Sequence, residues 1–149
     1  MIPWDTSCVL KLYAPEADSR EYMQLAGRFG PLCTSDLTKT ELFYGLLRKQ
    51  TAGDIRPRSA EVAFGKFVED EAKGRFIFFP LGEDVRLEAS KVAQRCYGAA
   101  APVAVRTLDG LHLATALVAS LQEVATADER MLQALPLLGL RERRAGPEQ

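Results

Sequence analysis

The sequence predicts a single α/β domain, a three-layer α/β/α sandwich in which helices cover both faces of a mostly parallel sheet. Short apolar segments with the composition of strands alternate with longer segments of helical periodicity, and this alternation is typical of a covered parallel sheet. A length of 149 residues, with 47% hydrophobic and 26% charged residues, fits one ordinary globular domain with a sizeable core. We expect this domain to span residues 1–140, followed by a frayed polar tail over 141–149.

The first part of the chain predicts a strand, two helices and a second strand. Favoured helix caps, Asp5-Thr6-Ser7, follow the first apolar run, and Pro15 ends the helix that they begin. Asp18 and Ser19 cap the second helix, and glycines end it. These elements are expected at 1–4, 8–13, 19–26 and 32–34.

Two amphipathic helices follow. Ser35 caps the first, which extends to about residue 50. Along it, side chains at spacings of four, three and four form one stripe, made of Leu37, Glu41, Tyr44 and Arg48. The second helix covers 59–73 and has a continuous apolar face. We expect the two helices to pack as a pair.

The last part of the chain continues the alternation. The run Phe76–Phe79, followed by Pro80, has the composition of a buried strand. Further helices are expected at 83–97, 107–120 and 129–135, and further strands at 123–127 and 137–140. In parallel sheets of this kind, ligands bind beyond the carboxyl ends of the strands, which directs attention to the residues that follow each strand.

Charge and cysteine usage exclude several classes. The chain has 19 Lys and Arg against 20 Asp and Glu, a net charge of −1, so it is not a globally basic nucleic-acid binder and any phosphate affinity must be local. A local basic rim is available in Lys11, Lys39, Arg48, Lys49, Arg56, Arg58 and Arg106. The three cysteines form no Cys-x-x-Cys pair, so zinc is disfavoured and the thiols are interpreted as small buried groups.

We expect a cytoplasmic protein without a membrane contact. No apolar stretch reaches the roughly 18 residues that a transmembrane helix needs, and the start of the chain lacks the pattern of a secretory signal.

Four carboxylates stand where a metal-dependent nuclease needs them. Asp5 and Asp128 follow strands, Glu41 lies within the apolar stripe of a helix, and Asp109 opens an apolar helix. Carboxylates that converge resist ionising together unless a cation is bound, and oxygen ligands select hard cations. The sequence therefore predicts a site for Mg²⁺ or Mn²⁺ made of Asp5, Glu41, Asp109 and Asp128.

Each acid also has a purely structural interpretation. Asp5 and Asp128 are possible helix caps, and Asp109 can complement the dipole of its helix. Glu41 is harder to explain in this way, because an ionised group on an apolar stripe is costly unless it is paired, for example with Arg48. The single histidine, His112, is interpreted as structural, and the aromatic run at 76–79 as core rather than as a base-stacking surface.

Taken in order, these motifs resemble the PIN-domain family, and within it the VapC-type toxins of prokaryotic toxin-antitoxin pairs. The motifs are Asp5-Thr6-Ser7, Glu41 after Ser35-Asp36-Leu37, the run from Leu108 to Ala116, and Thr126-Ala127-Asp128. The resemblance implies that Asp5, Glu41, Asp109 and Asp128 hold one or two Mg²⁺ or Mn²⁺ ions, with the hydroxyls of Thr6, Ser7 and Thr126 beside them. It also implies endonucleolytic cleavage of RNA by metal-activated water, neutralisation by a cognate antitoxin protein, and homodimers.

Other functions remain open. The same fold also serves housekeeping RNA-processing or DNA-acting nucleases, and a site without turnover would leave a binding module. A phosphoaspartate receiver would need an acidic pair after the first strand, and a dehalogenase-type phosphatase a second Asp at the position of Ser7. Dinucleotide binding is disfavoured, because no Gly-x-Gly-x-x-Gly follows a strand.

Overall fold

The computed structural model describes residues 1–146 of the chain. Its strands are short and all of them pair in parallel. They are β1 (Pro3–Trp4), β2 (Leu32–Ser35), β3 (Phe76–Phe79), β4 (Glu123–Val124) and β5 (Arg141–Glu142). The helices are α1 (Thr6–Tyr13), α2 (Ser19–Gly27), α3 (Leu37–Ala52), α4 (Ser59–Ala72), α5 (Glu83–Tyr97), α6 (Thr107–Val118) and α7 (Glu129–Ala134), with a short 3₁₀ helix at Leu135–Leu138.

The strands form two small sheets that meet at β1. In the first, β2 lies between β1 and β3, and in the second β4 pairs with β5. A parallel bridge between Trp4 and Ala125 joins them. The Asp5 amide donates to the Ala125 carbonyl at 3.0 Å, and the Ala125 amide donates to the Pro3 carbonyl at 2.9 Å. The bridge therefore places the carboxyl ends of β1 and β4 side by side, although they are far apart in sequence.

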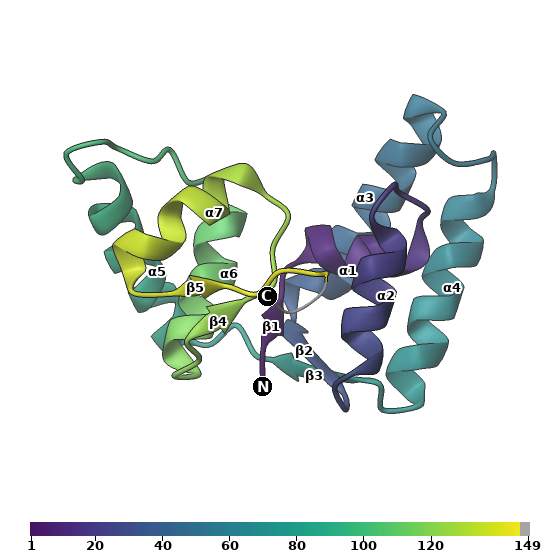
Figure 1. The fold of residues 1–149 in the computed structure, drawn as a ribbon, viewed down its shortest axis with the longest axis horizontal. Helices are drawn as coiled ribbons and strands as arrows, with labels where there is room; N and C mark the ends of the chain where they lie inside the picture. The colour runs from purple at the N-terminus through teal and green to yellow at the C-terminus, as the bar shows by residue number, and fades with distance from the viewer. Residues whose placement is uncertain (147–149) are drawn as a thin grey trace.

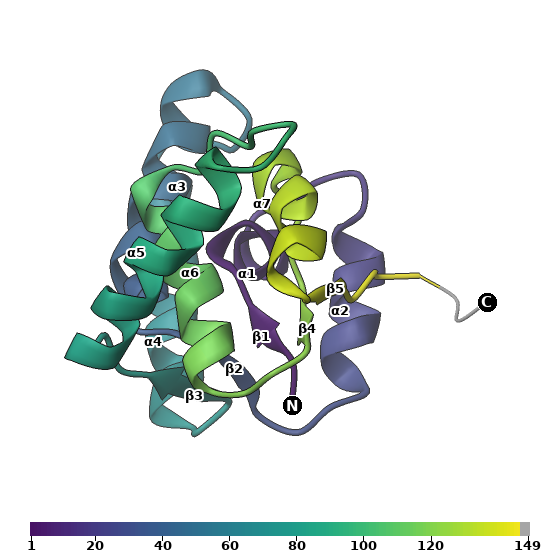
Figure 2. The same cartoon turned by 90° about the vertical axis from the view of Figure 1, so that its left-hand side faces the viewer.

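Helices cover both faces of these strands, as the alternation predicted. Figure 2 shows β1 and β4 between two groups of helices, with α5 and α6 on one side and α2 and α7 on the other. Along the long axis of the molecule, α1 to α4 lie at one end and α5 to α7 at the other, with β1 between them (Figure 1). The three-layer α/β/α sandwich with a parallel sheet is confirmed.

The core has two apolar clusters, one at each end of the molecule. The first surrounds Trp4, Leu46 and Phe67, which are almost completely buried. The second surrounds Val92, Leu113 and Met131, which are equally buried. All three cysteines are free and buried, as expected. Within residues 1–146, no helix is both long and apolar enough to cross a membrane.

Two details of the sequence prediction are wrong. The strand expected at 137–140 does not form, because Pro136 opens a 3₁₀ turn that Gly139 ends in the left-handed conformation. The strand forms instead at Arg141–Glu142, inside the segment expected to be a frayed tail, and it pairs with β4. The run at Phe76–Phe79 is only partly core: Phe76 is buried, but Ile77 is 39% exposed, because β3 is an edge strand. Residues 147–149 of the expected tail lie outside the described part.

Candidate active site

Asp5 is fixed where β1 ends and α1 begins. One carboxylate oxygen, Oδ1, accepts hydrogen bonds from the Ser7 hydroxyl at 2.6 Å and from the Cys8 amide at 3.1 Å. The other, Oδ2, accepts from the Thr126 hydroxyl at 2.7 Å. Asp5 is therefore the N-cap of α1, as the structural interpretation held, and it also faces the end of β4.

Glu41 projects from α3 toward α1 and α6. Its Oε1 accepts a hydrogen bond from the Thr6 hydroxyl at 3.0 Å and lies 2.5 Å from His112 Nε2. His112 is 7% exposed. The interpretation of His112 as merely structural is incomplete, because it contacts one of the four acids. The clue in the sequence was its position one helical turn after Asp109.

Asp109 and Asp128 share one guanidinium. Arg106 Nε donates to Asp109 Oδ2 at 3.0 Å, and its NH2 group donates to Asp128 Oδ2 at 3.4 Å. Oδ1 of Asp128 accepts from the amides of Arg130 and Met131, so this acid also caps α7. Sequence reasoning placed Arg106 in a basic rim and missed its position between two acids.

Hydroxyl groups connect the strand ends. Thr126 Oγ1 donates to Asp5 and accepts from the Asp128 amide at 3.1 Å. Ser7 Oγ donates to Asp5 and accepts from the Ala127 amide at 3.0 Å. Hydrogen bonds through Thr126 and Arg106 therefore connect Asp5, Asp109 and Asp128. Glu41 forms a separate hydrogen-bonded group with Thr6 and His112, which acts on Asp5 through the charge of His112. Asp5 thus lies beside Thr126 and Ser7, and Asp109 and Asp128 lie on either side of Arg106; the role of the four acids stays a prediction.

The pKa values of Asp5, which is buried, and of Glu41, which is partly buried, are shifted in opposite directions. Burial raises the pKa of Asp5, although the charge of His112 and the hydrogen bonds from Ser7 and Thr126 oppose it. Burial acts in the same direction on Glu41, but there the hydrogen bond and charge of His112, with help from Thr6 and Arg48, outweigh it and lower the pKa. Glu41 is therefore held ionised, whereas ionised Asp5 is costly without a compensating cation.

The donor set fits a hard divalent cation in chemistry but is not tightly drawn together. Among residues 1–146, no three His, Cys, Asp or Glu side chains are close enough to form a metal-binding group. The only positive charge between Asp109 and Asp128 in this part of the chain is that of Arg106, whose side chain is 62% exposed and therefore free to move. Asp109 and Asp128 thus already share one positively charged group, so the space between these two carboxylates favours a cation.

A groove of about 770 Å³ opens from the acids to the surface. One wall is α3 and the other is the start of α6. It is lined by Leu37, Thr40, Glu41, Tyr44, Arg48, Arg106, Thr107, Leu108 and Asp109. The groove gives a long, polar ligand access to Glu41 and Asp109.

The PIN-domain profile matches residues 4–135. The chain belongs to the PIN-domain family. PIN domains are nucleases, and the family predicted from the motifs is confirmed. None of the curated proteins matches the sequence.

Solved structures share the fold of this PIN domain at low sequence identity. FitAcB from Neisseria gonorrhoeae is 20% identical, with a TM-score of 0.69 over 97% of this chain and 98% of that one. A toxin-antitoxin complex from Klebsiella pneumoniae is 17% identical, with a TM-score of 0.65 over 92% and 94%. VapBC2 from Rickettsia felis, bound to a DNA fragment from its promoter, is 12% identical, with a TM-score of 0.65 over 97% and 100%.

Proposed function

We propose that this protein is a metal-dependent endoribonuclease that cleaves RNA phosphodiester bonds. The observation that supports the proposal is the placement of the four acids. Asp5 and Asp128 follow neighbouring parallel strands and are linked to Asp109 by hydrogen bonds through Thr126 and Arg106, while Glu41 and Asp109 line an open groove. The four acids come from four separate elements, and structural capping alone does not require their convergence.

Carboxylate oxygens of these four residues would hold Mg²⁺ or Mn²⁺, with Asp5 and Asp109 as the first direct ligands. When bound, the cation supplies Lewis acidity that lowers the pKa of a water molecule and offsets charge on the scissile phosphate. A cation held by Asp109 and Asp128 would take the place of the Arg106 guanidinium, which contacts both acids.

The chain's own residues prepare this step. Ser7, Thr126 and the Cys8 amide fix the orientation of Asp5, and Thr6 and His112 fix that of Glu41. Arg106 has a natural second role once it leaves the acids, because a guanidinium pairs well with phosphate. No side-chain nucleophile is needed, so the hydroxyls of Thr6 and Ser7 act as orienting groups.

The test is cleavage of RNA by the purified protein with Mg²⁺ or Mn²⁺. We expect RNA fragments that are absent in EDTA and absent with the Asp5→Ala variant. The control Arg95→Ala, which removes an exposed side chain of α5 outside the groove, should leave cleavage unchanged. A matched single-stranded DNA substrate tests the alternative of a DNA-acting nuclease. Cleavage that survives both EDTA and Asp5→Ala would reject the proposal.

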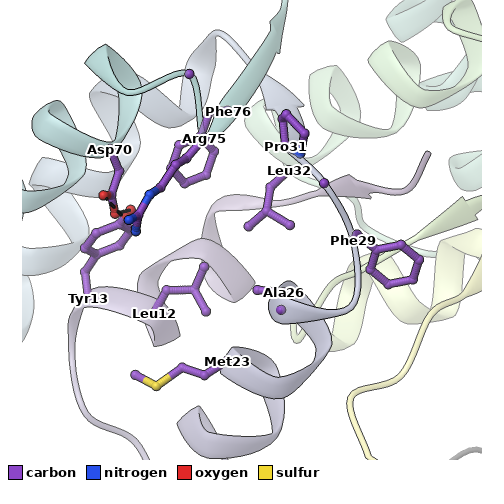
Figure 3. A pocket seen from close by; sticks show the side chains of 13 residues that line it. Leu12, Tyr13, Met23, Ala26, Phe29, Pro31, Leu32, Asp70, Arg75 and Phe76 are labelled. Atoms are coloured by element: carbon purple, nitrogen blue, oxygen red, sulfur yellow. Dashed lines mark hydrogen bonds and ion pairs between the residues drawn. The ribbon is translucent and has the colours of Figure 1, made fainter.

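We further propose that the protein is the toxin of a toxin-antitoxin pair and binds a small antitoxin protein. The similar folds of toxin-antitoxin complexes support this. So does a second hollow of about 530 Å³ between α1, α2 and the start of β2. Figure 3 shows Leu12, Leu32 and Met23 around it, with Tyr13, Asp70 and Arg75 grouped at one end.

This hollow suits a protein segment better than a charged substrate. Its charged groups are already paired, since Asp70 accepts from the Tyr13 hydroxyl at 2.8 Å and lies 3.1 Å from Arg75 NH1. Met23 and Phe29 are 52% and 39% exposed on its rim, and exposed apolar patches mark protein contacts.

Growth assays separate the toxin from a housekeeping nuclease. Expression of the protein alone should arrest growth, and co-expression of the small protein encoded beside it should restore growth. Met23→Glu should prevent the rescue and leave RNA cleavage unchanged. Val62→Glu, at a similarly exposed apolar position on α4, should leave both the rescue and the cleavage unchanged. Normal growth with an active enzyme would favour the housekeeping function.

A further inference from the structure

One face of α3 lines the groove beside Asp109, and of the residues on this face the proposed chemistry uses only Glu41. The stripe Leu37, Glu41, Tyr44 and Arg48 was visible in the sequence as a helical repeat, and all four side chains line the 770 Å³ groove. Glu41 is one of the four acids of the proposed site and contacts Thr6 and His112. Tyr44 and Arg48 follow it by one and two helical turns and lead away from the acids along the groove.

Tyr44 and Arg48 are not needed to hold the fold together. Tyr44 is 62% exposed, a high value for an aromatic ring. Within residues 1–146, its hydroxyl has no hydrogen bond and Arg48 has no ion pair. The positive charge of Arg48 acts instead on the groove, where it helps to lower the pKa of Glu41. An exposed ring and an unpaired guanidinium thus stand side by side on one helix.

The opposite wall completes the pattern. Arg106 stands beside the acids, and Leu108 is 45% exposed next to Asp109. The groove is therefore lined by two arginines, Arg48 and Arg106, by two acids, Glu41 and Asp109, and by the exposed ring of Tyr44. Basic side chains beside an aromatic platform are the general device for binding single strands, because every base offers a π-face for stacking.

Resting on the proposed nuclease function, we propose that this stripe is a subsite for single-stranded nucleic acid. A base beside the scissile phosphate stacks on Tyr44, and a backbone phosphate further along the strand is held by Arg48. The seven residue steps from Glu41 to Arg48 rise about 10 Å along the helix, about three steps of a stacked strand. A base inside a duplex cannot expose its face to Tyr44, so the subsite selects unpaired substrate.

The experiment measures binding of a short single strand that carries the fluorescent base 2-aminopurine, in EDTA at low salt so that it is not cleaved. The variants are Tyr44→Ala, Tyr44→Phe and Arg48→Ala. Two control variants change exposed side chains of α5 outside the groove. Leu87→Ala removes an exposed apolar side chain, as a control for Tyr44→Ala, and Arg95→Ala removes an exposed arginine, as a control for Arg48→Ala. The same sequence as a duplex is the matched control ligand.

We expect the wild-type protein to quench 2-aminopurine and to prefer the single strand. Tyr44→Ala should lose the quenching and bind about 5- to 100-fold more weakly, the range of one base-aromatic stack, while Tyr44→Phe retains both. Arg48→Ala should weaken binding and reduce the slope of log affinity against log salt by about 0.7, the value for one phosphate contact on a single strand. Both α5 controls should bind as the wild type does.

Other outcomes overturn the subsite or the function separately. If Tyr44→Ala binds and quenches like the wild type while RNA is still cleaved, the subsite is wrong and the nuclease function stands. If Tyr44→Ala lowers the molar mass in solution from a dimer to a monomer, the groove faces a second copy of the chain, and the subsite is also wrong. If binding depends on Tyr44 but no nucleic acid is cleaved with any metal, the subsite stands and the proposed nuclease function fails.

Discussion

The two halves of the acidic site stabilise their carboxylates by different means. Asp5 and Glu41, from the half of the molecule built on α1 to α4, are held by neutral or hydrogen-bonding neighbours: hydroxyls, a backbone amide and His112. Asp109 and Asp128, from the half built on α5 to α7, face the mobile guanidinium of Arg106. The first pair thus has no arginine in hydrogen-bond contact, whereas the second pair shares one exposed arginine, although Asp128 is also oriented by the two amides that it caps.

This difference assigns distinct tasks to the two pairs. A carboxylate with both oxygens hydrogen-bonded is preorganised, and its geometry does not depend on a bound ion. A carboxylate that shares an exposed arginine can give up that partner for a metal or a phosphate at little cost, because surface ion pairs contribute at most about 1 kcal/mol. Asp5 is a carboxylate of the first kind and Asp109 one of the second, so Asp5 would define the position of a cation that Asp109 would help to hold.

The largest effect is expected when one acid of each pair is replaced by its amide. Asp5→Asn and Asp109→Asn should each reduce RNA cleavage on the order of 10³-fold, equivalent to about 4 kcal/mol of transition-state stabilisation. Only Asp5→Asn should also lower the free energy of unfolding, by about 1 to 3 kcal/mol, because its amide nitrogen faces a hydroxyl that already donates. Cleavage rates and urea titrations check both. Equal stability losses in the two variants would contradict the distinction between the pairs.

A substitution in the core tests whether the half built on α1 to α4 and the half built on α5 to α7 unfold as one unit. Leu113→Ala in the second apolar cluster should cost about 2 to 5 kcal/mol. The only tryptophan, Trp4, lies in the first cluster, yet its fluorescence should report the same lowered midpoint as circular dichroism does. Leu46→Ala in the first cluster is the matched control. Two separate transitions would mean that the halves fold independently.

A smaller effect is expected from the shared arginine. Arg106→Gln should tighten Mn²⁺ binding about tenfold, since the ion no longer competes with a charge that lies between Asp109 and Asp128. Calorimetric titration of the metal-free protein measures this, with Arg95→Gln as control. Unchanged or weaker affinity would show that Arg106 does not stand in for the metal. Cleavage should not rise in parallel, because Arg106 is also expected to hold phosphate.

The smallest effect concerns the pH dependence of stability in the metal-free protein. The pKa of Asp5 is raised in the folded state, so its contribution is full below the unfolded value of 3.8 and is lost as the pH rises. The pKa of Glu41 is lowered, so its contribution is present above 4.5 and is lost as the pH falls.

Amide variants should therefore diverge with pH. The stability cost of Asp5→Asn should grow as the pH falls from 7 toward 3.8, whereas the cost of Glu41→Gln should shrink as the pH falls below 4.5. Urea unfolding at a series of pH values compares each variant with the wild type. Parallel slopes for the two variants would refute the opposite shifts.

The positions of the four acids could be predicted from the sequence, but their hydrogen-bond and ion-pair partners could not. Asp5 and Asp128 follow strands, and the rule for the carboxyl ends of parallel strands suffices to bring them together. The contact between His112 and Glu41 joins residues 71 positions apart, and the bridge made by Arg106 depends on how α6 packs against α7. Such contacts arise from tertiary packing and leave no local pattern.

Errors in the predicted fold were confined to the end of the chain and to a sheet edge. The composition of the leucine-rich run at 137–140 is compatible with a strand and with a short helix. Pro136 and Gly139 favour the 3₁₀ helix that forms. Ile77 shows the related limit that an apolar run does not reveal whether its strand lies at the centre or at the edge of a sheet. Tertiary context settles both cases.

The bridge between Trp4 and Ala125 has a consequence for synthesis. A chain emerging from the ribosome presents Asp5 and Glu41 long before β4 exists, and only β4 brings Asp128 beside Asp5. Contacts between residues so distant in sequence form late in folding. A nascent chain that ends before β4 therefore lacks Asp128 and the strand that places it, so the set of four acids is incomplete until β4 has been made.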